Sequence, residues 1–589
     1  MKDFVKMICA VICAFIIMSA ISFVLCIGML GTLAAAGSGK TVVPKSAVLT
    51  VDMSKITIAE QTLESNPFSS VSIPVGGLAS FAGSGETIGI WDAVQAVNAA
   101  ADDPAIKFIY LRTDGSATGV STLSEFRKAL ANFRGNSGKP VVSYVEAPGT
   151  GSYYLASVAD KVYMTSHPGA TVTLSGISTQ MIFLGDLLKK FGVNVQLIRH
   201  GKYKSAGEMY TRSSSSPENR EQYQRLVDSM WGYMSSEIAQ SRGITVERLN
   251  QAIDNLELCI PEDFVNAGLV DELLTKQGLE SKLTTLFEVE DIKDVKSISL
   301  YDYAQAKLLP SKAKQKIAVI YADGEIVDGK GESEVAGSRF ASIISKVRAD
   351  STVKAVVLRV NSPGGSVLAS EKIKNEMDLL KAAKPVIASY GEYAASGGYW
   401  ISNNCDKIYS NATTLTGSIG VFGMVPDISA TLKDIAHVGV ETVTSNKHGD
   451  MYGLMRPFDS DEYNYMLRSI EDIYDKFTTI VSEGRGLPKD TVDEIGQGRV
   501  WTGADGLTIN LVDEIGSLED AVKYAAVAAG DPDLAAWNVK AYPKPEDQMS
   551  QILKQLSGSR DGEDVLVERL GNLTSVEYVA RLPYDLVIK

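Results

Sequence analysis

The sequence of 589 residues predicts an α/β layer protein, built from two tandem copies of one domain behind an N-terminal apolar segment. Short apolar stretches that read as buried strands alternate with helical patterns, which is typical of βαβ units. Landmarks of the first half recur about 245 residues later, a spacing that indicates domain duplication and not a solenoid. An uncharged run over residues 7–39 is long enough to cross a bilayer as a helix.

The N-terminal run predicts a membrane anchor within residues 1–40. Lys2 and Lys6 precede it, so the positive-inside rule keeps the N-terminus in the cytoplasm and places the body across the membrane. The small residues at 34–37 resemble a cleavage site, and a cleaved signal peptide stays open as the alternative. We therefore expect a single-pass protein with a large body on the extracytoplasmic side of the membrane.

The composition and net charge limit the classes of binding partner that we expect. Hydrophobic residues make up 45% and charged residues 22% of the chain, which is ordinary for a globular protein. The formal net charge is −14, whereas phosphate binding requires clustered Lys and Arg. Nucleic acid is therefore not an expected partner.

The duplication is visible in paired strands, helices and landmarks. The apolar stretch 106–114 matches 353–361, and both end in a turn. The long helical patterns 216–243 and 460–486 occupy the same place in each half. Further landmarks coincide: Gly151 with Gly397, Tyr153 with Tyr399, 160–161 with 406–407, and 174–176 with 415–417.

These matches divide the chain into a first copy over 45–310, a second copy over 311–540 and a tail over 541–589. The stretch 280–313 is expected to connect the copies. The polar tail is expected to be peripheral.

A small-residue turn holds the first chemistry-bearing residue. Ser396 follows an apolar strand within the sequence GEYAASGGYWI and precedes a helical pattern. A serine at such a junction lies near free backbone N–H groups and the positive end of a helix dipole. An exposed nucleophile with an oxyanion site nearby needs these conditions, although Ser-Gly-Gly alone is also common in plain turns.

Two further motifs complete a possible site. The sequence NSPGGS at 361–366 ends a predicted strand, where open α/β sheets build their sites. The sequence RHGKYKSA at 199–206 places Lys204 among small residues after another strand. A lysine acts as a base when burial lowers its pKa enough to populate the neutral amine.

The sequence does not indicate a catalytic or metal-binding role for its histidines or cysteines. None of the four histidines lies in a triad or metal-ligand motif, so a hydrolase here would pair serine with lysine. Outside the apolar run the cysteines are Cys259 and Cys405, which we interpret as two buried free thiols, with a disulfide between them as the alternative.

Each copy retains half of this site. The first copy has Thr150 where the second has Ser396, and it has Asp-Gly-Ser at 114–116 in place of the Pro-Gly-Gly turn. The second copy has SNKHGD at 445–450 where the first has the lysine motif. Lys447 is an alternative base within the second copy, but its neighbours are polar and look solvated.

Taken together, the motifs NSPGGS, AASGGYWIS, LTGSIGVFG and GKYKSA resemble the signal peptide peptidase A family in its long, duplicated, membrane-anchored bacterial form. The resemblance covers nearly the whole chain. It implies a fold like that of Clp proteases and crotonases, an assembly into a tetrameric bowl, and a place in a bacterial inner membrane with the body on the periplasmic side. Neither a cofactor nor a metal is expected. The site residues that it implies are Ser396 as nucleophile, Lys204 as base, Ser418 as hydrogen-bond partner of the lysine, and Gly397 with either Gly364 or Gly365 as oxyanion donors.

The function implied is a serine endopeptidase that degrades remnant signal peptides at the membrane, with an alkaline-leaning activity profile. Three alternatives stay open. The first is a broader quality-control protease for membrane proteins. The second is a hydratase or isomerase of the same fold acting on acyl thioesters, and the third is a scaffold without activity.

Overall fold

The computed structural model describes residues 42–62, 86–116, 118–170, 173–331, 334–544 and 579–581. The predicted anchor at 7–39 lies outside these ranges. Among the helices that are described, none combines the length and the apolar character that a membrane span requires.

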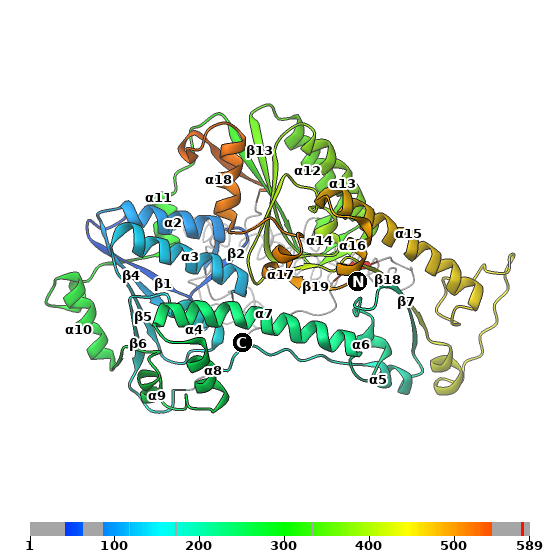
Figure 1. Ribbon diagram of the computed structural model, residues 1–589, viewed down its shortest axis with the longest axis horizontal. Helices are drawn as coiled ribbons and strands as arrows, with labels where there is room; N and C mark the ends of the chain where they lie inside the picture. The colour runs from blue at the N-terminus through cyan, green and yellow to red at the C-terminus, as the bar shows by residue number, and fades with distance from the viewer. Residues whose placement is uncertain are drawn as a thin grey trace, which may run out of the picture.

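Two parallel sheets with the same strand order form the frame of the molecule (Figure 1). The first has the order β8-β6-β5-β4-β1-β9 and the second has the corresponding order β20-β16-β15-β13-β10-β21. This correspondence confirms the α/β class and the tandem copies. The first sheet consists of β1 (Ala47–Asp52), β4 (Ile106–Arg112), β5 (Val141–Val145), β6 (Lys161–Thr165), β8 (Glu272–Leu274) and β9 (Ser297–Ser299). The second consists of β10 (Lys316–Asp323), β13 (Val353–Ser362), β15 (Val386–Ala395), β16 (Lys407–Ser410), β20 (Glu514–Ile515) and β21 (Asn538–Tyr542), with β17 (Leu415–Gly417) and β19 (Val500–Thr502) beyond β15.

Equivalent side chains make equivalent contacts in the two copies. The Tyr153 hydroxyl donates to the carbonyl oxygen of Leu269 at 2.5 Å. The Tyr399 hydroxyl donates to that of Leu511 at 2.9 Å. The landmarks that aligned in the sequence therefore hold the same position in each fold.

Helices cover the sheets, and the two longest of the described helices begin where their sequences provide side-chain caps. The predicted helix at 216–243 is α7 (Pro217–Arg242), whose N-cap Ser216 accepts from the amide of Asn219. The predicted helix at 460–486 is α15 (Ser460–Arg485), which Asp459 caps. The other helices of the first copy are α2 (Ile90–Asp102), α3 (Val120–Ser137), α4 (Thr150–Ala156), α5 (Gly185–Lys190), α6 (Glu208–Thr211), α8 (Val246–Asp254), α9 (Pro261–Asn266), α10 (Lys276–Phe287) and α11 (Leu300–Lys307). Those of the second copy are α12 (Gly337–Ala349), α13 (Val367–Lys381), α14 (Gly397–Trp400), α16 (Lys489–Ile495), α17 (Gly503–Thr508) and α18 (Leu518–Ala528).

A third sheet joins the two copies. Its order is β12-β11-β14-β22-β18-β7. Strand β7 (Asn194–His200) comes from the first copy and pairs antiparallel with β18 (Val421–Asp427) of the second along its whole length. The remaining strands are β11 (Ile326–Val327), β12 (Val335–Ala336), β14 (Gly364–Ser366) and β22 (Val579–Arg581).

Three expectations from the sequence are wrong. The stretch 280–313 is more than a connection, because β9 pairs with β1 inside the first sheet. The tail is not wholly peripheral, because β22 pairs with β14 and β18. Both cysteines are free, but only Cys405 is buried, whereas Cys259 is exposed.

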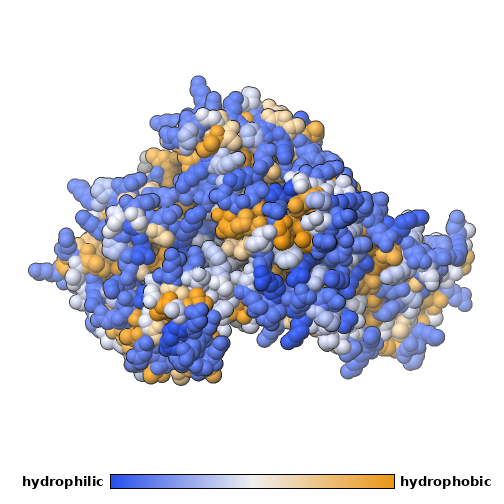
Figure 2. Space-filling view, viewed as in Figure 1, coloured by the Kyte–Doolittle hydropathy of each residue, from blue (hydrophilic) through white to orange (hydrophobic). Residues whose placement is uncertain are grey.

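The copies share a continuous apolar core, while hydrophilic side chains cover most of the face seen in Figure 2. In addition, a buried ion cluster crosses the boundary. The Arg359 guanidinium on β13 binds Glu60 at 2.7 Å and Glu125 on α3 at 2.8 Å. All three side chains are at least 94% shielded from solvent, since none exceeds 6% exposure. Burial, which outweighs the attraction of Arg359, raises the pKa of Glu60 to about 7.

We expect Glu125→Ala to loosen the packing of the two copies. It removes one carboxylate from Arg359 and leaves that buried guanidinium under-compensated, which lowers the free energy of unfolding by about 3–5 kcal/mol. The midpoint of thermal unfolding checks this. Glu257→Ala breaks the exposed pair with Arg248 and is the matched control. Equal shifts for the two variants would contradict the role of the buried cluster.

Candidate active site

Ser396 lies at the junction of β15 and α14. It is fully buried and has φ 55° and ψ −112°, a strained conformation for a residue with a side chain. Its amide donates to the carbonyl oxygen of Gly417 at 2.8 Å, which helps to hold that conformation. The next residue has little room for a side chain, because a Cβ at Gly397 would lie 2.7 Å from the Ser370 hydroxyl and 3.2 Å from the Gly364 Cα.

Lys204 reaches this serine from the other copy. Strand β7 ends at His200, and its pairing with β18 carries the following loop over the second copy. The Lys204 Nζ lies 2.9 Å from the Ser396 Oγ. It also lies 2.9 Å from the Ser418 Oγ and 3.2 Å from the Ser418 carbonyl oxygen. The structure thus brings together the three side chains that the sequence placed in separate motifs.

The environment of Lys204 favours its neutral amine. The side chain is 1% exposed, and burial lowers its pKa from the ordinary 10.5 to about 7. The nearby carboxylate of Glu208 is used elsewhere, because it accepts from Arg199 at 3.2 Å and from the amide of Ser216 at 3.1 Å. A neutral amine can accept the proton of the Ser396 hydroxyl while it donates to Ser418.

A pair of glycines from the second copy fits around Lys204. A Cβ at Gly498 would lie 2.5 Å from the Lys204 Cβ and 2.7 Å from its amide nitrogen. A Cβ at Gly420 would lie 2.6 Å from the Gly498 Cα and 3.3 Å from the Lys204 Cδ. These positions therefore set where the lysine stem can lie. Sequence reasoning missed them, because a lone glycine in a loop carries no signal about a contact made by a distant segment.

Arg199 is a second residue that the sequence reasoning did not assign. Its guanidinium donates to the carbonyl oxygen of Lys204 at 2.7 Å and pairs with Glu208 at 3.2 Å. It therefore fixes the backbone of the lysine loop without touching the amine. Its position in the same motif, five residues before Lys204, was the available signal.

The predicted oxyanion glycines lie beside one another. The Gly397 Cβ position is 3.2 Å from both the Gly364 Cα and the Gly365 nitrogen. The amide of Gly364 donates to the Ser362 hydroxyl at 3.3 Å, so it already has a partner. A Cβ at Gly365 would lie 1.9 Å from the Ile326 carbonyl oxygen, so only glycine fits there.

Thr150, which corresponds to Ser396, and Lys447, the alternative base, do not form a serine–lysine pair of this kind. The Thr150 hydroxyl of the first copy instead donates to the carbonyl oxygen of Gly176 at 2.9 Å and accepts from the amide of Ser175 at 3.3 Å. Lys447 is largely exposed and pairs with Asp461 at 2.7 Å, which raises its pKa. A lysine held in its charged form is a poor base.

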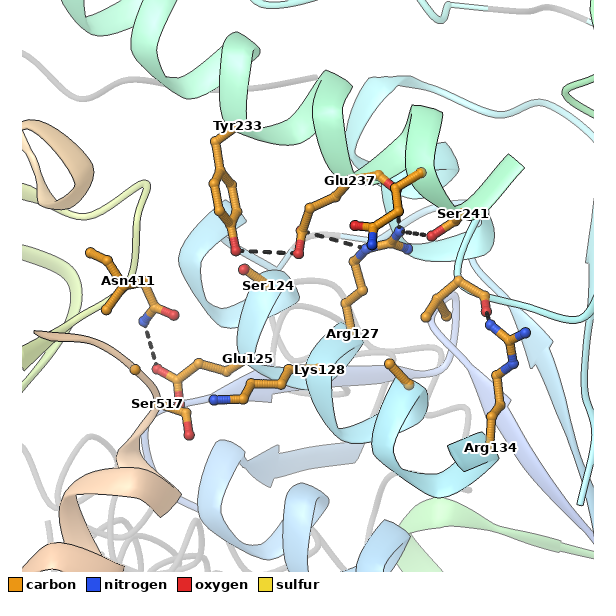
Figure 3. Close-up of a pocket in the computed structure, with 15 residues that line it drawn as sticks. Ser124, Glu125, Arg127, Lys128, Arg134, Tyr233, Glu237, Ser241, Asn411 and Ser517 are labelled. Atoms are coloured by element: carbon orange, nitrogen blue, oxygen red, sulfur yellow. Dashed lines mark hydrogen bonds and ion pairs between the residues drawn. The ribbon is translucent and has the colours of Figure 1, made fainter. Parts of the chain in front are cut away.

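In two other polar clusters of the described part of the chain, charged side chains pair with one another. A cavity of about 490 Å³ lies between α3, α7 and the second copy (Figure 3). Its Arg127 is paired with Glu237, and its Lys128 is paired with Asp520. The carboxylate oxygens of Glu462 and the ring of His448 could hold an ion, yet Arg456 donates to both oxygens at 2.6 Å. Neither cluster indicates a cofactor.

Comparisons with known proteins agree on one family. A model described as Peptidase family S49 matches residues 134–290 and 378–530. Protease 4 of Haemophilus influenzae is 36% identical over 503 residues, covering 82% of this chain and 80% of that protein. The chloroplastic serine protease SPPA of Arabidopsis thaliana is 31% identical over 490 residues, covering 82% of this chain and 72% of that protein. An Enterococcus faecium protein, provisionally named signal peptide peptidase SppA, is 34% identical over 220 residues, covering 36% of this chain and 62% of that protein.

The lowered pKa of Lys204 predicts how stability changes with pH. Between the folded pKa of about 7 and the ordinary 10.5, the unfolded chain holds a proton at Lys204 that the folded chain does not. The free energy of unfolding therefore rises with pH in this window by roughly 1.4 kcal/mol per pH unit relative to Lys204→Met. Denaturation of both proteins between pH 7.5 and 9.5 measures the difference.

Lys447→Met is the control for this measurement. Its exposed side chain stays charged in both the folded and the unfolded chain over the same pH range. Its difference from the unsubstituted protein should therefore stay constant. A constant difference for Lys204→Met as well would show that the amine is not desolvated.

Proposed function

We propose that this chain, which belongs to peptidase family S49 and is a serine protease, hydrolyses peptide bonds with Ser396 as nucleophile and Lys204 as general base. One observation carries the assignment of these residues. A fully buried lysine, with a pKa near neutrality and no carboxylate partner among the described residues, points its amine at a serine hydroxyl 2.9 Å away. A buried amine in contact with a hydroxyl is the arrangement that activates a serine without histidine.

Acylation begins with proton transfer. The neutral Lys204 amine takes the proton of the Ser396 hydroxyl as the oxygen attacks the substrate carbonyl. Negative charge then develops on the carbonyl oxygen. We assign its stabilisation to the backbone amides of Gly397 and Gly365, in preference to Gly364, whose amide is bonded to Ser362.

The proton then moves to the leaving group. The Lys204 ammonium protonates the departing amine, which regenerates the base and leaves an ester on Ser396. Water attacks this ester with Lys204 again as base. Ser418 accepts from the amine at 2.9 Å throughout, so it orients the lysine lone pair toward Ser396. Because the base must be neutral, the rate of acylation rises as the pH passes through about 7.

The substrates that we propose are signal peptides left in the membrane after secretion. The name of the Enterococcus faecium relative and the apolar run at 7–39 support this. A single span there would hold the body at the periplasmic surface of an inner membrane, where such peptides reside. We also propose a homotetramer and the division of the chain into 1–40, 45–310, 311–540 and 541–589.

Ser396→Ala and Lys204→Ala should each lower kcat on a fluorogenic signal-peptide substrate by at least about a thousandfold, because each removes half of the proton-transfer pair. Purified full-length protein in detergent is the material for the assay. A folded globular protein serves as the second substrate and should be cleaved far more slowly.

Matched controls come from the chain itself. Thr150→Ala changes the position in the first copy that corresponds to Ser396, and Lys202→Ala removes an exposed lysine two residues from the base. Both should retain activity. Substantial activity in Ser396→Ala or Lys204→Ala would remove the proposed dyad, and equal cleavage of the folded protein would favour broader quality control.

Gly498→Ala should impair catalysis by displacing the base. Its methyl group would overlap the Lys204 backbone, and a shift of about 1 Å at a catalytic group can lower the rate about a hundredfold. Measuring kcat and the thermal midpoint of the variant separates misplacement from unfolding.

Gly486→Ala is the matched control for this prediction. Gly486 has a similar positive φ of 64°, compared with 77° at Gly498, but a Cβ there would meet nothing within 4 Å. The two variants therefore share the backbone strain and differ in the contact. If both lower kcat alike, the contact with Lys204 has no special role.

A further inference from the structure

A short segment of the second copy, residues 497–500, bonds to both halves of the proposed active site through its main chain. The carbonyl oxygen of Gln497 accepts at 2.9 Å from the amide of Tyr203, in the loop that carries the proposed base. The carbonyl oxygen of Arg499 accepts at 2.7 Å from the amide of Ser418, whose hydroxyl contacts the amine of that base. The segment therefore links the lysine loop of the first copy to the serine turn of the second.

The side chain of Arg499 packs against two aromatic rings, one from each copy. Its guanidinium carbon lies 4.6 Å from the centroid of the Tyr203 ring and 4.5 Å from that of the Trp501 ring. The arginine side chain is 18% exposed, and the attraction between a cation and a ring is stronger where water is partly excluded. A planar guanidinium can stack on such rings, whereas the ammonium of a lysine cannot reproduce the stack.

The same guanidinium also makes polar contacts with the first copy. It donates to the Tyr203 hydroxyl at 3.2 Å and pairs with Glu221 on α7 at 3.1 Å. The Tyr203 hydroxyl in turn donates to the Glu221 carboxylate at 3.2 Å. The next amide, that of Val500, donates to the Gln222 side chain at 2.7 Å, where α7 lies beside β19 (Figure 1). Arg499 is therefore bonded to two separate segments of the first copy, the lysine loop and α7.

The charged groups around this stack do not pair with the amine of the proposed base. Glu221 pairs with Arg499, and the Lys202 amine lies over the same tyrosine ring, 5.1 Å from its centroid. Within the first copy, Glu208 pairs with Arg199. Burial is what lowers the pKa of the proposed base, so any loosening that admits water to its amine should raise that pKa.

We propose that Arg499 is a positioning residue of the active site, which clamps the lysine loop of the first copy, residues 201–204, onto the Ser418 turn of the second. This inference rests on the proposed function of Lys204 for its kinetic consequence. The stack holds Tyr203, the neighbour of the base, while the carbonyl oxygen of Arg499 holds the backbone of Ser418. The clamp thus sets where the amine lies relative to the serine hydroxyls, and it keeps the amine away from water.

The first experiment measures the pH profile of Arg499→Lys on the fluorogenic signal-peptide substrate, with full-length protein in detergent. The substitution keeps the positive charge and removes the planar fork. At pH 7, kcat should fall at least about tenfold with KM unchanged, because a displaced base reacts more slowly. The midpoint of the kcat profile should rise by about one pH unit, because a loosened loop admits water to the amine. An unchanged midpoint, even with a lower thermal midpoint, would overturn the proposal.

Matched controls come from an exposed pair of the same kind. On α15, the Arg468 guanidinium lies over the Tyr465 ring, 5.8 Å from its centroid. Arg468→Lys should leave both kcat and the midpoint of its pH profile unchanged. Tyr203→Leu removes one ring of the stack and should reproduce the effect of Arg499→Lys, whereas Tyr465→Leu should not. Equal pH profiles for Tyr203→Leu and Tyr465→Leu would contradict the clamp.

The second experiment detects the clamp without catalysis. The free energy of unfolding, relative to Lys204→Met, begins to rise with pH at the folded pKa of about 7. In an Arg499→Lys background this onset should move to about pH 8, because the folded amine is better hydrated. The substitution at position 499 is present in both proteins of the pair, so its own titration cancels. An onset that stays at about 7 in that background would overturn the proposal.

The two experiments separate the positioning role from the identity of the base. Retained cleavage by Lys204→Ala would remove the assigned base, and the unfolding comparison would still report whether Arg499 keeps the amine away from water. Loss of cleavage in Lys204→Ala, together with an unchanged onset in the Arg499→Lys background, would leave the base assigned and the positioning role refuted.

Discussion

The antiparallel pairing of β7 with β18 is the interaction on which the rest of the site depends. It carries a strand of the first copy into a sheet of the second, and the loop after it delivers Lys204 to Ser396. The other contacts between the copies hold this pairing in place. Arg359 is locked between Glu60 and Glu125, and Glu392 of the second copy accepts from the first amides of α3. A rigid boundary is needed because a proton transfer tolerates little change in distance.

The burial of Lys204 away from solvent determines the pKa of its amine, on which the proposed mechanism depends. Burial away from every described carboxylate costs stability, since the charged amine loses its hydration, but it also leaves an amine whose pKa is near neutrality, as the proposed base requires. The carboxylate of Glu208 does not pair with Lys204, because it accepts from Arg199 and from the amide of Ser216. Stability and reactivity are therefore opposed at this residue, and the glycines at 420 and 498 permit the packing that keeps it dry.

The sequence was sufficient for the parts of the fold that repeat. Paired landmarks such as Tyr153 and Tyr399 indicated two copies, and the complementary halves of the motifs indicated that Ser396 and Lys204 meet across them. It was insufficient where a residue's role comes from a distant partner. The sequence around Gly498 does not predict its contact with the Lys204 side chain. The sequence around Arg359 does not predict that this arginine is buried between two carboxylates. The polarity of the tail likewise concealed β22, because three residues that pair through their main chain need no apolar pattern.

The division of the site between two copies also governs when it can come into existence. The ribosome makes β7 and Lys204 long before β18 and Ser396, so a half-made chain holds the proposed base without the proposed nucleophile. The first copy by itself carries Thr150 in the position that corresponds to Ser396, so it lacks the nucleophile of the proposed mechanism. The proposed dyad therefore forms only when β18 pairs with β7. On the proposed mechanism, the chain stays inactive until most of its own synthesis is complete.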